Sequence, residues 1–411
     1  LRALLAHKHQ QTFPEPQTTE KIDPALAKNL DGVYRGERGT VELLERDGEL
    51  FAWLGSVRLA VKSTGEKLIT DDRHSSGTII TPAADGSITI GNRRYQRVQV
   101  AKPPPAPAHW LHLIGEYGWD HNVLFVFEKD QKLHALIEWG FDYPLQELEP
   151  DVFAFPDYGL YHGEKLIFER DGSGKVERVV AAGIAFERRN IGVEAGETFK
   201  IDPVKPVDEL REVALSASPP VQPDDLLPPD LVDLAELEAT LNFDIRYATT
   251  NNFMNAVFYR QPRAFMQRPA AEALVRAHRQ LAKHGYGLLI YDAYRPWYVT
   301  KMLCDATPES MKDFVANPQT GSIHNRGAAV DLTLYDLQTG EPVQMVGGYD
   351  EFSERSFPDY VGGTALQRWH RELLRDAMEA QGFTVYRYEW WHFNHENAAR
   401  YPILNAVFEE L

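Results

Sequence analysis

Two proline-rich segments divide this chain of 411 residues into separate parts. Residues 102–108 read KPPPAPA, and residues 202–230 contain prolines at short intervals. Proline fixes φ and lacks a backbone donor, so such segments are typical of extended connectors rather than packed elements. At roughly 150 residues per domain, the length also favours two or three domains. We expect an N-terminal extension (1–22), two modules (23–101 and 109–200), a proline-rich linker (201–230) and a C-terminal domain (231–411).

The two N-terminal modules repeat one another in sequence. Gly32-Val33-Tyr34 matches Gly115-Glu116-Tyr117, and residues 45–52 match residues 128–135. Short runs that alternate apolar and polar residues lie between Asp-Gly turns, a pattern that predicts antiparallel β-hairpins. We therefore expect each module to be an antiparallel meander or a barrel-like sheet, loosely similar to the lipocalin-like β modules of bacterial hydrolases. The turns are Asp47-Gly48, Asp85-Gly86 and Asp171-Gly172.

Histidine and aromatic residues are frequent in this N-terminal half. None of its histidines stands at a metal-binding spacing beside a carboxylate partner. Aromatic residues on alternating strand positions usually belong to a core, so a structural or docking role is expected, with binding of cell-wall glycan or peptide as the alternative. The residues concerned are His74, His109, His112, His121, His134, His162, Trp53, Trp110, Trp119, Trp139, Tyr158 and Tyr161.

Charge and cysteine content exclude several classes of protein. With 43 basic and 60 acidic residues the formal charge is −17, which argues against nucleic acid or an anionic membrane as the main partner. A single cysteine, Cys304, excludes an intramolecular disulfide and a cysteine-rich zinc site, and its context predicts the buried face of a helix. The sequence lacks an apolar run long enough for a transmembrane helix.

The sequence constrains the cellular compartment of the protein less strongly. The sequence begins at Leu1 rather than methionine, and residues 1–16 lack the continuous apolar core of a signal peptide but are compatible with a segment that follows a removed one. A periplasmic or otherwise exported protein is therefore expected, with the cytoplasm as the alternative.

Helix and strand patterns alternate in the C-terminal domain. Residues 269–285 and 365–382 have helical periodicity and end on glycine, while residues 287–292 and 383–393 read as strands. Helices that flank a few strands predict an α+β unit.

One cluster of polar residues lies at 322–331, which reads SIHNRGAAVD. Gly327 can adopt a positive φ, so the chain can fold back and direct His324 and Asp331 at one point. Asp331 has apolar neighbours, and a carboxylate in such a place needs a compensating cation. A capped turn without a metal is the alternative interpretation.

A second cluster is Glu389-Trp390-Trp391-His392. Residues three apart point to opposite faces of a strand but converge on a tight turn, so this spacing alone is ambiguous, and packing around the tryptophans is the alternative. Together the clusters supply two histidines and one carboxylate, the usual ligand set of a catalytic zinc that keeps a fourth position for water. Zinc lowers the pKa of that water towards ~7, and Glu389 would accept its proton.

The patterns SxHxxGxAxD and ExWH resemble the zinc D-alanyl-D-alanine dipeptidases of the VanX type, which are related to zinc D,D-carboxypeptidases. The resemblance covers about residues 231–411 and implies one Zn²⁺ held by His324, Asp331 and His392, with Glu389 as general base. Residues 291–296 (YDAYRP) resemble a further family segment, which implies that Arg295 stabilises the tetrahedral intermediate.

The resemblance extends to a substrate pocket. Residues 345–356 (MVGGYDEFSERS) are similar to a family stretch whose aspartate holds the free amine of the dipeptide, which maps to Asp350. Ser322 matches a serine beside the first ligand, with contact to the amine or orientation of His324 as its two possible roles. Tyr247 and Asn252-Phe253 match a segment that lines the pocket. Val-Gly-Gly-Tyr departs from the family's Gly-Thr-Pro-Phe before Asp350.

The sequence therefore predicts zinc-dependent hydrolysis of D-Ala-D-Ala or a similar short dipeptide. The alternative within the same chemistry is a D,D-carboxypeptidase or endopeptidase that acts on peptidoglycan stem peptides. The alternative from a different functional class is a non-catalytic protein that binds the cell wall through its β modules. Expected partners are a small dipeptide and, through the β modules, cell-wall fragments.

Overall fold

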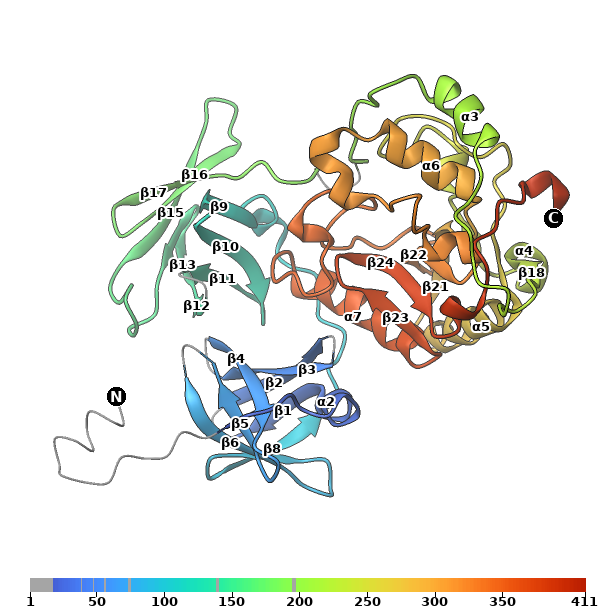
Figure 1. The fold of residues 1–411 in the computed structure, drawn as a ribbon. Coiled ribbons are helices and arrows are strands. Elements are labelled where there is room, and N and C mark those ends of the chain that lie inside the picture. The colour runs from blue at the N-terminus through green and yellow to red at the C-terminus, as the bar shows by residue number, and fades with distance from the viewer. Residues whose placement is uncertain are drawn as a thin grey trace.

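The computed structural model describes residues 18–37, 39–46, 48–54, 57–72, 75–137, 140–193 and 197–411. The predictions for residues 1–16 and those that involve Asp47, His74 and Trp139 lie outside this part of the chain. Two β units lie on one side of a C-terminal α+β domain (Figure 1). No helix in the described residues is both long and apolar enough to span a bilayer.

The first β unit is a closed antiparallel barrel of eight strands. Apolar residues alternate along its strands and fill the interior, with Leu43, Ala52 and Ile88 fully buried. Helix α2 (Pro24–Leu30) precedes the barrel, and Ile22 already belongs to its core. The strands are β1 (Gly32–Gly36), β2 (Gly39–Arg46), β3 (Glu49–Leu54), β4 (Val57–Ser63), β5 (Leu68–Asp71), β6 (Ser76–Pro82), β7 (Ile88–Ile90) and β8 (Arg93–Val98).

The second β unit consists of two antiparallel sheets around one core. One sheet has the order β12-β11-β10-β9, and the other runs β13 to β17 in sequence order. The prediction of antiparallel β structure is thus confirmed, and only the first unit is a closed barrel. The strands are β9 (Gly115–Trp119), β10 (Asn122–Lys129), β11 (Lys132–Ile137), β12 (Phe141–Pro144), β13 (Gln146–Glu149), β14 (Val152–Ala154), β15 (Lys165–Arg170), β16 (Val176–Ala181) and β17 (Ile184–Glu187).

The sequence repeat corresponds to a repeated structural motif. In the first unit the Tyr34 hydroxyl donates to the carbonyl four residues earlier (2.9 Å), and Arg97 lies 5.8 Å from the centre of the Tyr34 ring. In the second unit Tyr117 makes the same bond (2.7 Å), and Arg188 lies 5.4 Å from its ring. The same buried tyrosine anchors the first strand of both units, as expected for two copies of one ancestral unit.

The proline-rich segment 201–230 is not a purely extended linker, which corrects the prediction. It contains helix α3 (Val207–Ser216), whose Leu210 and Ala214 are buried in the core of the C-terminal domain. Helix α3 packs against α6 (Trp297–Ala306). Pro206 sits at the N-cap of α3, a place where proline does not interrupt a helix, so the prolines mark the ends of this helix.

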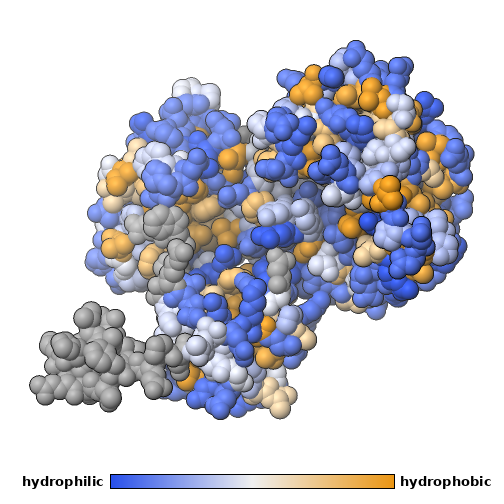
Figure 2. Space-filling model, viewed as in Figure 1, coloured by the Kyte–Doolittle hydropathy of each residue, from blue (hydrophilic) through white to orange (hydrophobic). Residues whose placement is uncertain are grey.

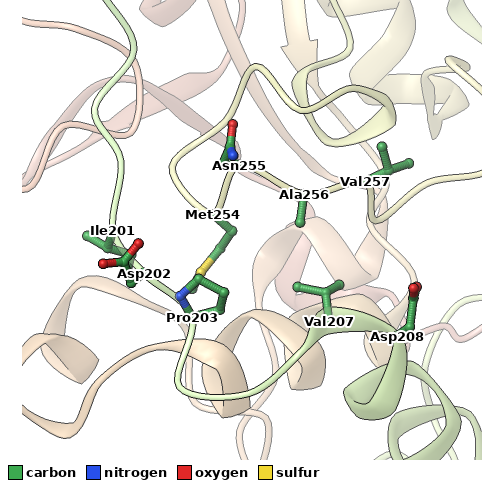
Figure 3. A pocket seen from close by; sticks show the side chains of 9 residues that line it. All are labelled: Ile201, Asp202, Pro203, Val207, Asp208, Met254, Asn255, Ala256 and Val257. Atoms are coloured by element: carbon green, nitrogen blue, oxygen red, sulfur yellow. The ribbon is translucent and has the colours of Figure 1, made fainter.

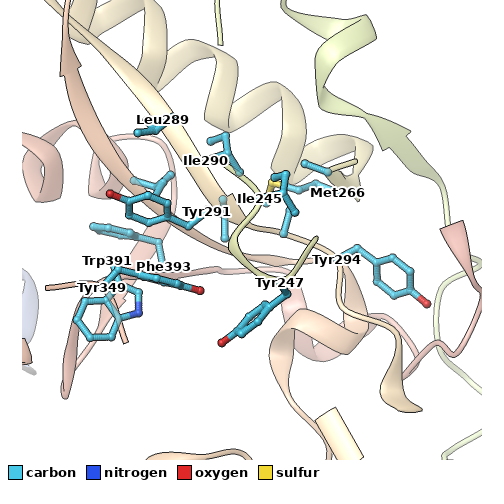
Figure 4. Close-up of a cluster of buried hydrophobic side chains, with 14 of the residues drawn as sticks. Ile245, Tyr247, Met266, Leu289, Ile290, Tyr291, Tyr294, Tyr349, Trp391 and Phe393 are labelled. Atoms are coloured by element: carbon cyan, nitrogen blue, oxygen red, sulfur yellow. The ribbon is translucent and has the colours of Figure 1, made fainter. Parts of the chain in front are cut away.

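A five-stranded mixed sheet forms the centre of the C-terminal domain, with the order β19-β21-β22-β24-β23. Only β19 and β21 are parallel. Helices α5 and α7 pack against each other and against the sheet. Apolar residues of the sheet, of these helices and of the surrounding loops form the largest core, part of which is drawn in Figure 4. The elements are β18 (Leu231–Asp233), α4 (Leu234–Leu237), β19 (Asn242–Phe243), β20 (Phe265–Gln267), α5 (Arg268–Ala282), β21 (Tyr286–Asp292), β22 (Ala329–Asp336), α7 (Ala365–Glu379), β23 (Phe383–Tyr386) and β24 (Glu389–His395).

Two local predictions in this domain need correction. Residues 383–393 were expected as one strand but form a hairpin of β23 and β24, in which Tyr386 pairs with Glu389. Cys304 lies on α6 as expected, but it is only partly buried.

The visible surface of the molecule is mainly hydrophilic, with small hydrophobic areas scattered over it (Figure 2). This agrees with a chain that carries 60 acidic and 43 basic residues.

Candidate metal and substrate site

Neighbouring strands bring two aspartate side chains and one histidine side chain into one row. Asp331 on β22 pairs with His392 on β24 and with Asp292 on β21. Side chains of directly paired residues lie on the same face of a sheet, so Asp292, Asp331 and His392 converge. The sheet thus places both predicted clusters at one point.

His324 reaches the same point from a short 3₁₀ turn, η4 (Ile323–Arg326). Gly327 ends this turn with a φ of 65°, the left-handed conformation predicted for it. The Ser322 hydroxyl accepts a hydrogen bond from the His324 backbone N–H (3.2 Å), and Asn325 completes a capping box. Of the two roles expected for Ser322, the geometry supports orientation of His324.

One nitrogen of each histidine and one oxygen of Asp331 lie close together at this point. His324 Nε2 is 3.2 Å from Asp331 Oδ1 and 3.1 Å from His392 Nδ1, and His392 Nδ1 is 3.0 Å from Asp331 Oδ1. All three residues are buried. Bond lengths of about 2.0–2.2 Å to zinc imply ligand separations of about 3.3–3.6 Å in a tetrahedral site, close to the 3.0–3.2 Å of this triangle.

The other ring nitrogens have partners that set the tautomers. His324 Nδ1 lies 2.6 Å from the Ala293 carbonyl oxygen, and His392 Nε2 lies 2.9 Å from Asn394 Oδ1. A ring N–H directed at each oxygen leaves lone pairs on the nitrogens that face Asp331. Burial by itself raises the pKa of Asp331, but when the rings of His324 and His392 are protonated, their charges and hydrogen bonds lower it below its ordinary value. A carboxylate and two lone pairs facing one another fit a cation between them.

Arg295 is held at the edge of this cluster by Asp292. Its Nε donates to Asp292 Oδ2 (2.8 Å), its Nη2 lies 2.8 Å from the same oxygen, and Nη2 is 3.6 Å from Asp331 Oδ2. Tyr259 donates to the second oxygen of Asp292 (2.7 Å). Both ends of the Asp292–Arg295 pair are buried, so the guanidinium is fixed and faces the site.

Asp350 and Tyr247 form a second part of the site. The Tyr247 hydroxyl donates to Asp350 Oδ2 (2.8 Å), and the Tyr247 ring lies 5.0 Å from the Arg295 guanidinium. Burial, followed by the charge of Asp331, raises the pKa of Asp350 well above its usual range. A cationic ligand would restore the charged form of this carboxylate.

Asn252 and Phe253 behave differently from their predicted role. The Asn252 side-chain amide donates to the carbonyl groups of Arg246, Thr249 and Ala256, and the residue is fully buried. It therefore organises the loop that carries Tyr247 rather than lining a pocket. Phe253 packs against the Tyr247 ring.

Glu389 begins strand β24, and its side chain turns towards His392. Its Oε2 lies 3.7 Å from His392 Nδ1, and 27% of its side chain is exposed. The ambiguity of the three-residue spacing is resolved by the tight β23–β24 hairpin, where the strand register shifts beside Glu389. Burial, aided by the charge of Asp331, raises the pKa of Glu389 to about 7, a value suited to a general base.

His395 lies on the same strand β24, three residues after His392. It is buried, packs on Phe383 at 5.1 Å between ring centres, and its Nδ1 accepts a hydrogen bond from Asn397 N. Its role is therefore in the packing of the domain.

Several residues of the site were missed by sequence reasoning. Asp292 orients Arg295, Asn394 orients His392, and Tyr349 donates to Asp331 Oδ2 (3.0 Å). Asp292 stands three residues before Arg295 in the segment YDAYRP, so an ion pair across that turn was a detectable signal. The roles of Asn394 and Tyr349 depend on strand register and loop path, which no local pattern reveals.

A hollow of 440 Å³ lies elsewhere in the domain, between the segment before α3 and the 254–257 loop (Figure 3). None of the predicted site residues lines it. The lining residues are Ile201, Asp202, Pro203, Val207, Asp208, Met254, Asn255, Ala256 and Val257.

Substitution of Asp292 by asparagine is expected to reduce kcat/KM for a dipeptide by about 10- to 100-fold, because Arg295 would lose its charged anchor. Steady-state kinetics with metal analysis of the same samples would measure the effect. Asp305→Asn is the matched control, since Asp305 makes an ion pair with Lys301 on α6. An Asp292→Asn variant as active as the Asp305→Asn variant would contradict this role.

Comparison with known proteins agrees with this geometry. The sequence model of peptidase family M15, described as D-ala-D-ala dipeptidase, matches residues 229–410. The D-alanyl-D-alanine dipeptidase of Escherichia coli K12 is 37% identical over 179 residues, which cover 44% of this chain and 91% of the relative. That of Enterococcus faecium is 35% identical over 181 residues (39% and 88%), and that of Streptomyces coelicolor is 33% identical over 182 residues (40% and 90%).

The buried His-Asp-His group and these matches define the chain as a metallopeptidase. It belongs to the D-Ala-D-Ala dipeptidase family, peptidase family M15, through its C-terminal domain. The two β units lie outside the matched region.

Proposed function

We propose that this protein hydrolyses D-Ala-D-Ala or a similar short dipeptide with the help of one zinc ion held by His324, Asp331 and His392. The observation that carries the proposal is the arrangement of a buried group that could hold a cation next to a partly buried carboxylate, Asp350. The first would serve the scissile bond and the second the free amine of a dipeptide. The family matches support the same substrate class.

When bound, zinc would supply Lewis-acid polarisation and ease deprotonation of water. Glu389 takes the proton of the attacking water on its carboxylate and passes it to the nitrogen of the leaving amino acid. Arg295, held by Asp292, donates hydrogen bonds to the oxygen on which negative charge develops. Because Asp292 fixes the guanidinium beforehand, little reorganisation is needed during the reaction.

Asp350 and Tyr247 hold the substrate at its other end. The Asp350 carboxylate pairs with the α-ammonium of the dipeptide, and the Tyr247 hydroxyl keeps that carboxylate in place. A free amine lies close to the scissile bond of a dipeptide, but a blocked peptide lacks it and the C-terminal bond of a longer peptide lies far from it. This geometry therefore favours dipeptides over the stem peptides that a D,D-carboxypeptidase or endopeptidase would cleave.

The substrate preference is tested by chromatography of the products from D-Ala-D-Ala and from an N-acylated tripeptide that ends in D-Ala-D-Ala. We expect D-alanine from the free dipeptide, loss of the activity with a chelator and its return with Zn²⁺. Cleavage of the blocked tripeptide alone would contradict the dipeptidase proposal and favour the carboxypeptidase alternative. No cleavage of either would favour a non-catalytic binding protein.

We propose that cell-wall fragments bind to the second β unit at Trp119, an exposed aromatic side chain at the end of β9. Co-sedimentation with isolated peptidoglycan, reduced in a Trp119→Ala variant, would support this second role. Equal sedimentation of both proteins would exclude it for Trp119.

A further inference from the structure

Both β units place a glutamate of the same hairpin against helix α7. Glu45 and Glu128 occupy equivalent positions in the repeat, and each accepts a hydrogen bond from a backbone N–H three residues later (2.7 and 3.0 Å). Both side chains are buried, although such hairpin ends are usually solvated. The second oxygen of each carboxylate faces α7. A buried carboxylate needs a hydrogen-bond donor or a cation as its partner, and in both β units helix α7 supplies it.

The partners lie near the two ends of α7. Glu128 Oε2 accepts a hydrogen bond from the backbone N–H of Ala365 at the helix start (2.8 Å), and Glu45 Oε2 lies 3.3 Å from Arg375 Nη2. Arg368 Nη2 donates to the Glu128 carbonyl (2.6 Å), and Arg375 Nη1 donates to the Glu45 carbonyl (3.4 Å). Arg368 and Arg375 are two helical turns apart, so they share one face of α7. In Figure 1, α7 lies on the side of the domain that faces both β units.

The segment that precedes α7, residues 346–363, is also held by the N-terminal half. Tyr360 donates to Glu116 Oε1 on β9 (2.8 Å), and Arg58 on β4 lies 3.5 Å from Asp359. Arg355 donates to the carbonyl groups of residues 191 and 193 (3.3 and 3.1 Å), which follow the second β unit. Both β units and the chain after them therefore contact this one segment.

The same segment carries Tyr349 and Asp350 at the site. Tyr349 contacts the proposed ligand Asp331, and Asp350 has a φ of 54°, which is unfavourable for a residue other than glycine. Apart from the 3₁₀ turn Glu354–Ser356, the segment has no regular secondary structure of its own. Its conformation therefore depends on contacts with the rest of the molecule.

We propose that the docked β units act as a brace that sets the position of Asp350 and hence the affinity of the site for the substrate ammonium group. The inference rests on the proposed role of Asp350 as amine anchor. Tyr360 and Glu116 are then positioning residues, because they contact neither the substrate nor the metal ligands. The N-terminal half lies outside the region that matches the dipeptidase family. As a brace, this half would nevertheless contribute to substrate binding.

The test uses the full chain with Tyr360→Phe, which removes only the hydroxyl and leaves Glu116 paired with Arg189 (3.1 Å). We expect KM for D-Ala-D-Ala to rise about 3- to 30-fold with kcat changed less than twofold. The inhibition constant of propanoyl-D-alanine, which lacks the α-amine, should stay within twofold. Tyr95→Phe is the matched control, since Tyr95 on β8 belongs to the core of the first β unit and has no place in the proposed contact.

A second variant, Glu128→Gln, weakens the contact with α7 and should change KM in the same direction. Hydrogen exchange in residues 346–363 should become faster in both variants. An unchanged KM, equal effects on the dipeptide and on propanoyl-D-alanine, or unchanged exchange in this segment would overturn the brace. Absence of dipeptide hydrolysis by the unmodified protein would instead overturn the proposed function, and the exchange rates would still decide whether docking holds the segment.

Discussion

Substitution of Glu389 by glutamine is expected to lower kcat for D-Ala-D-Ala by about 10²- to 10⁴-fold, the usual contribution of a positioned general base. Glutamine keeps the size of the side chain but cannot accept a proton. Glu389 lies 3.7 Å from His392 Nδ1 and outside the three-atom metal group, so the bound metal should remain. Product chromatography and metal analysis of the same preparation would measure both quantities.

The matched control is Glu396→Gln. Glu396 follows the same strand β24 but lies exposed beyond it, so its substitution should leave kcat unchanged. A Glu389→Gln enzyme with full zinc content and full activity would rule out the proposed proton transfer. Loss of metal together with activity would show that Glu389 is a ligand and not a base.

Much of this site could be predicted because its functional residues lie close together in short sequence segments. Gly327 between His324 and Asp331 indicates a turn that folds back on itself, and the structure has the left-handed residue at that position. The convergence of Glu389 and His392 could not be derived from spacing, because it depends on a hairpin within residues 383–395 that periodicity reads as one strand. Asp292 and Tyr349 reach the site through strand pairing and loop path, which are properties of tertiary structure.

The N-terminal half shows a similar limit. Alternating residues and Asp-Gly turns predict antiparallel strands, but the same alternation suits a closed barrel and two facing sheets, so closure could not be inferred. Helix α3 was missed because the prolines around it indicate an extended segment, whereas they lie outside the helix. Glu45 and Glu128 look like ordinary hairpin charges, and only their contacts with α7 distinguish them.

Substitution of Asp331 by asparagine, or of His324 by alanine, is expected to reduce bound zinc from about one ion per chain to less than a tenth, and activity with it. Asp331 is the only anionic member of the ligand group, and asparagine keeps its shape without its charge. Metal analysis after dialysis against a zinc-containing buffer would measure the loss. His284→Ala, which removes an exposed histidine after α5, is the control and should bind zinc normally.

Thermal unfolding gives an independent measure of the same site. A ligand that binds only the folded protein stabilises it by about 2.7 kcal/mol at a free concentration 100 times its Kd. A chelator should therefore lower the Tm of the unmodified protein and of His284→Ala, but leave the Tm of Asp331→Asn and His324→Ala unchanged. If the chelator lowered all four Tm values equally, the metal would bind elsewhere in the chain, and the triangle of His324, Asp331 and His392 would be a hydrogen-bonded group without an ion.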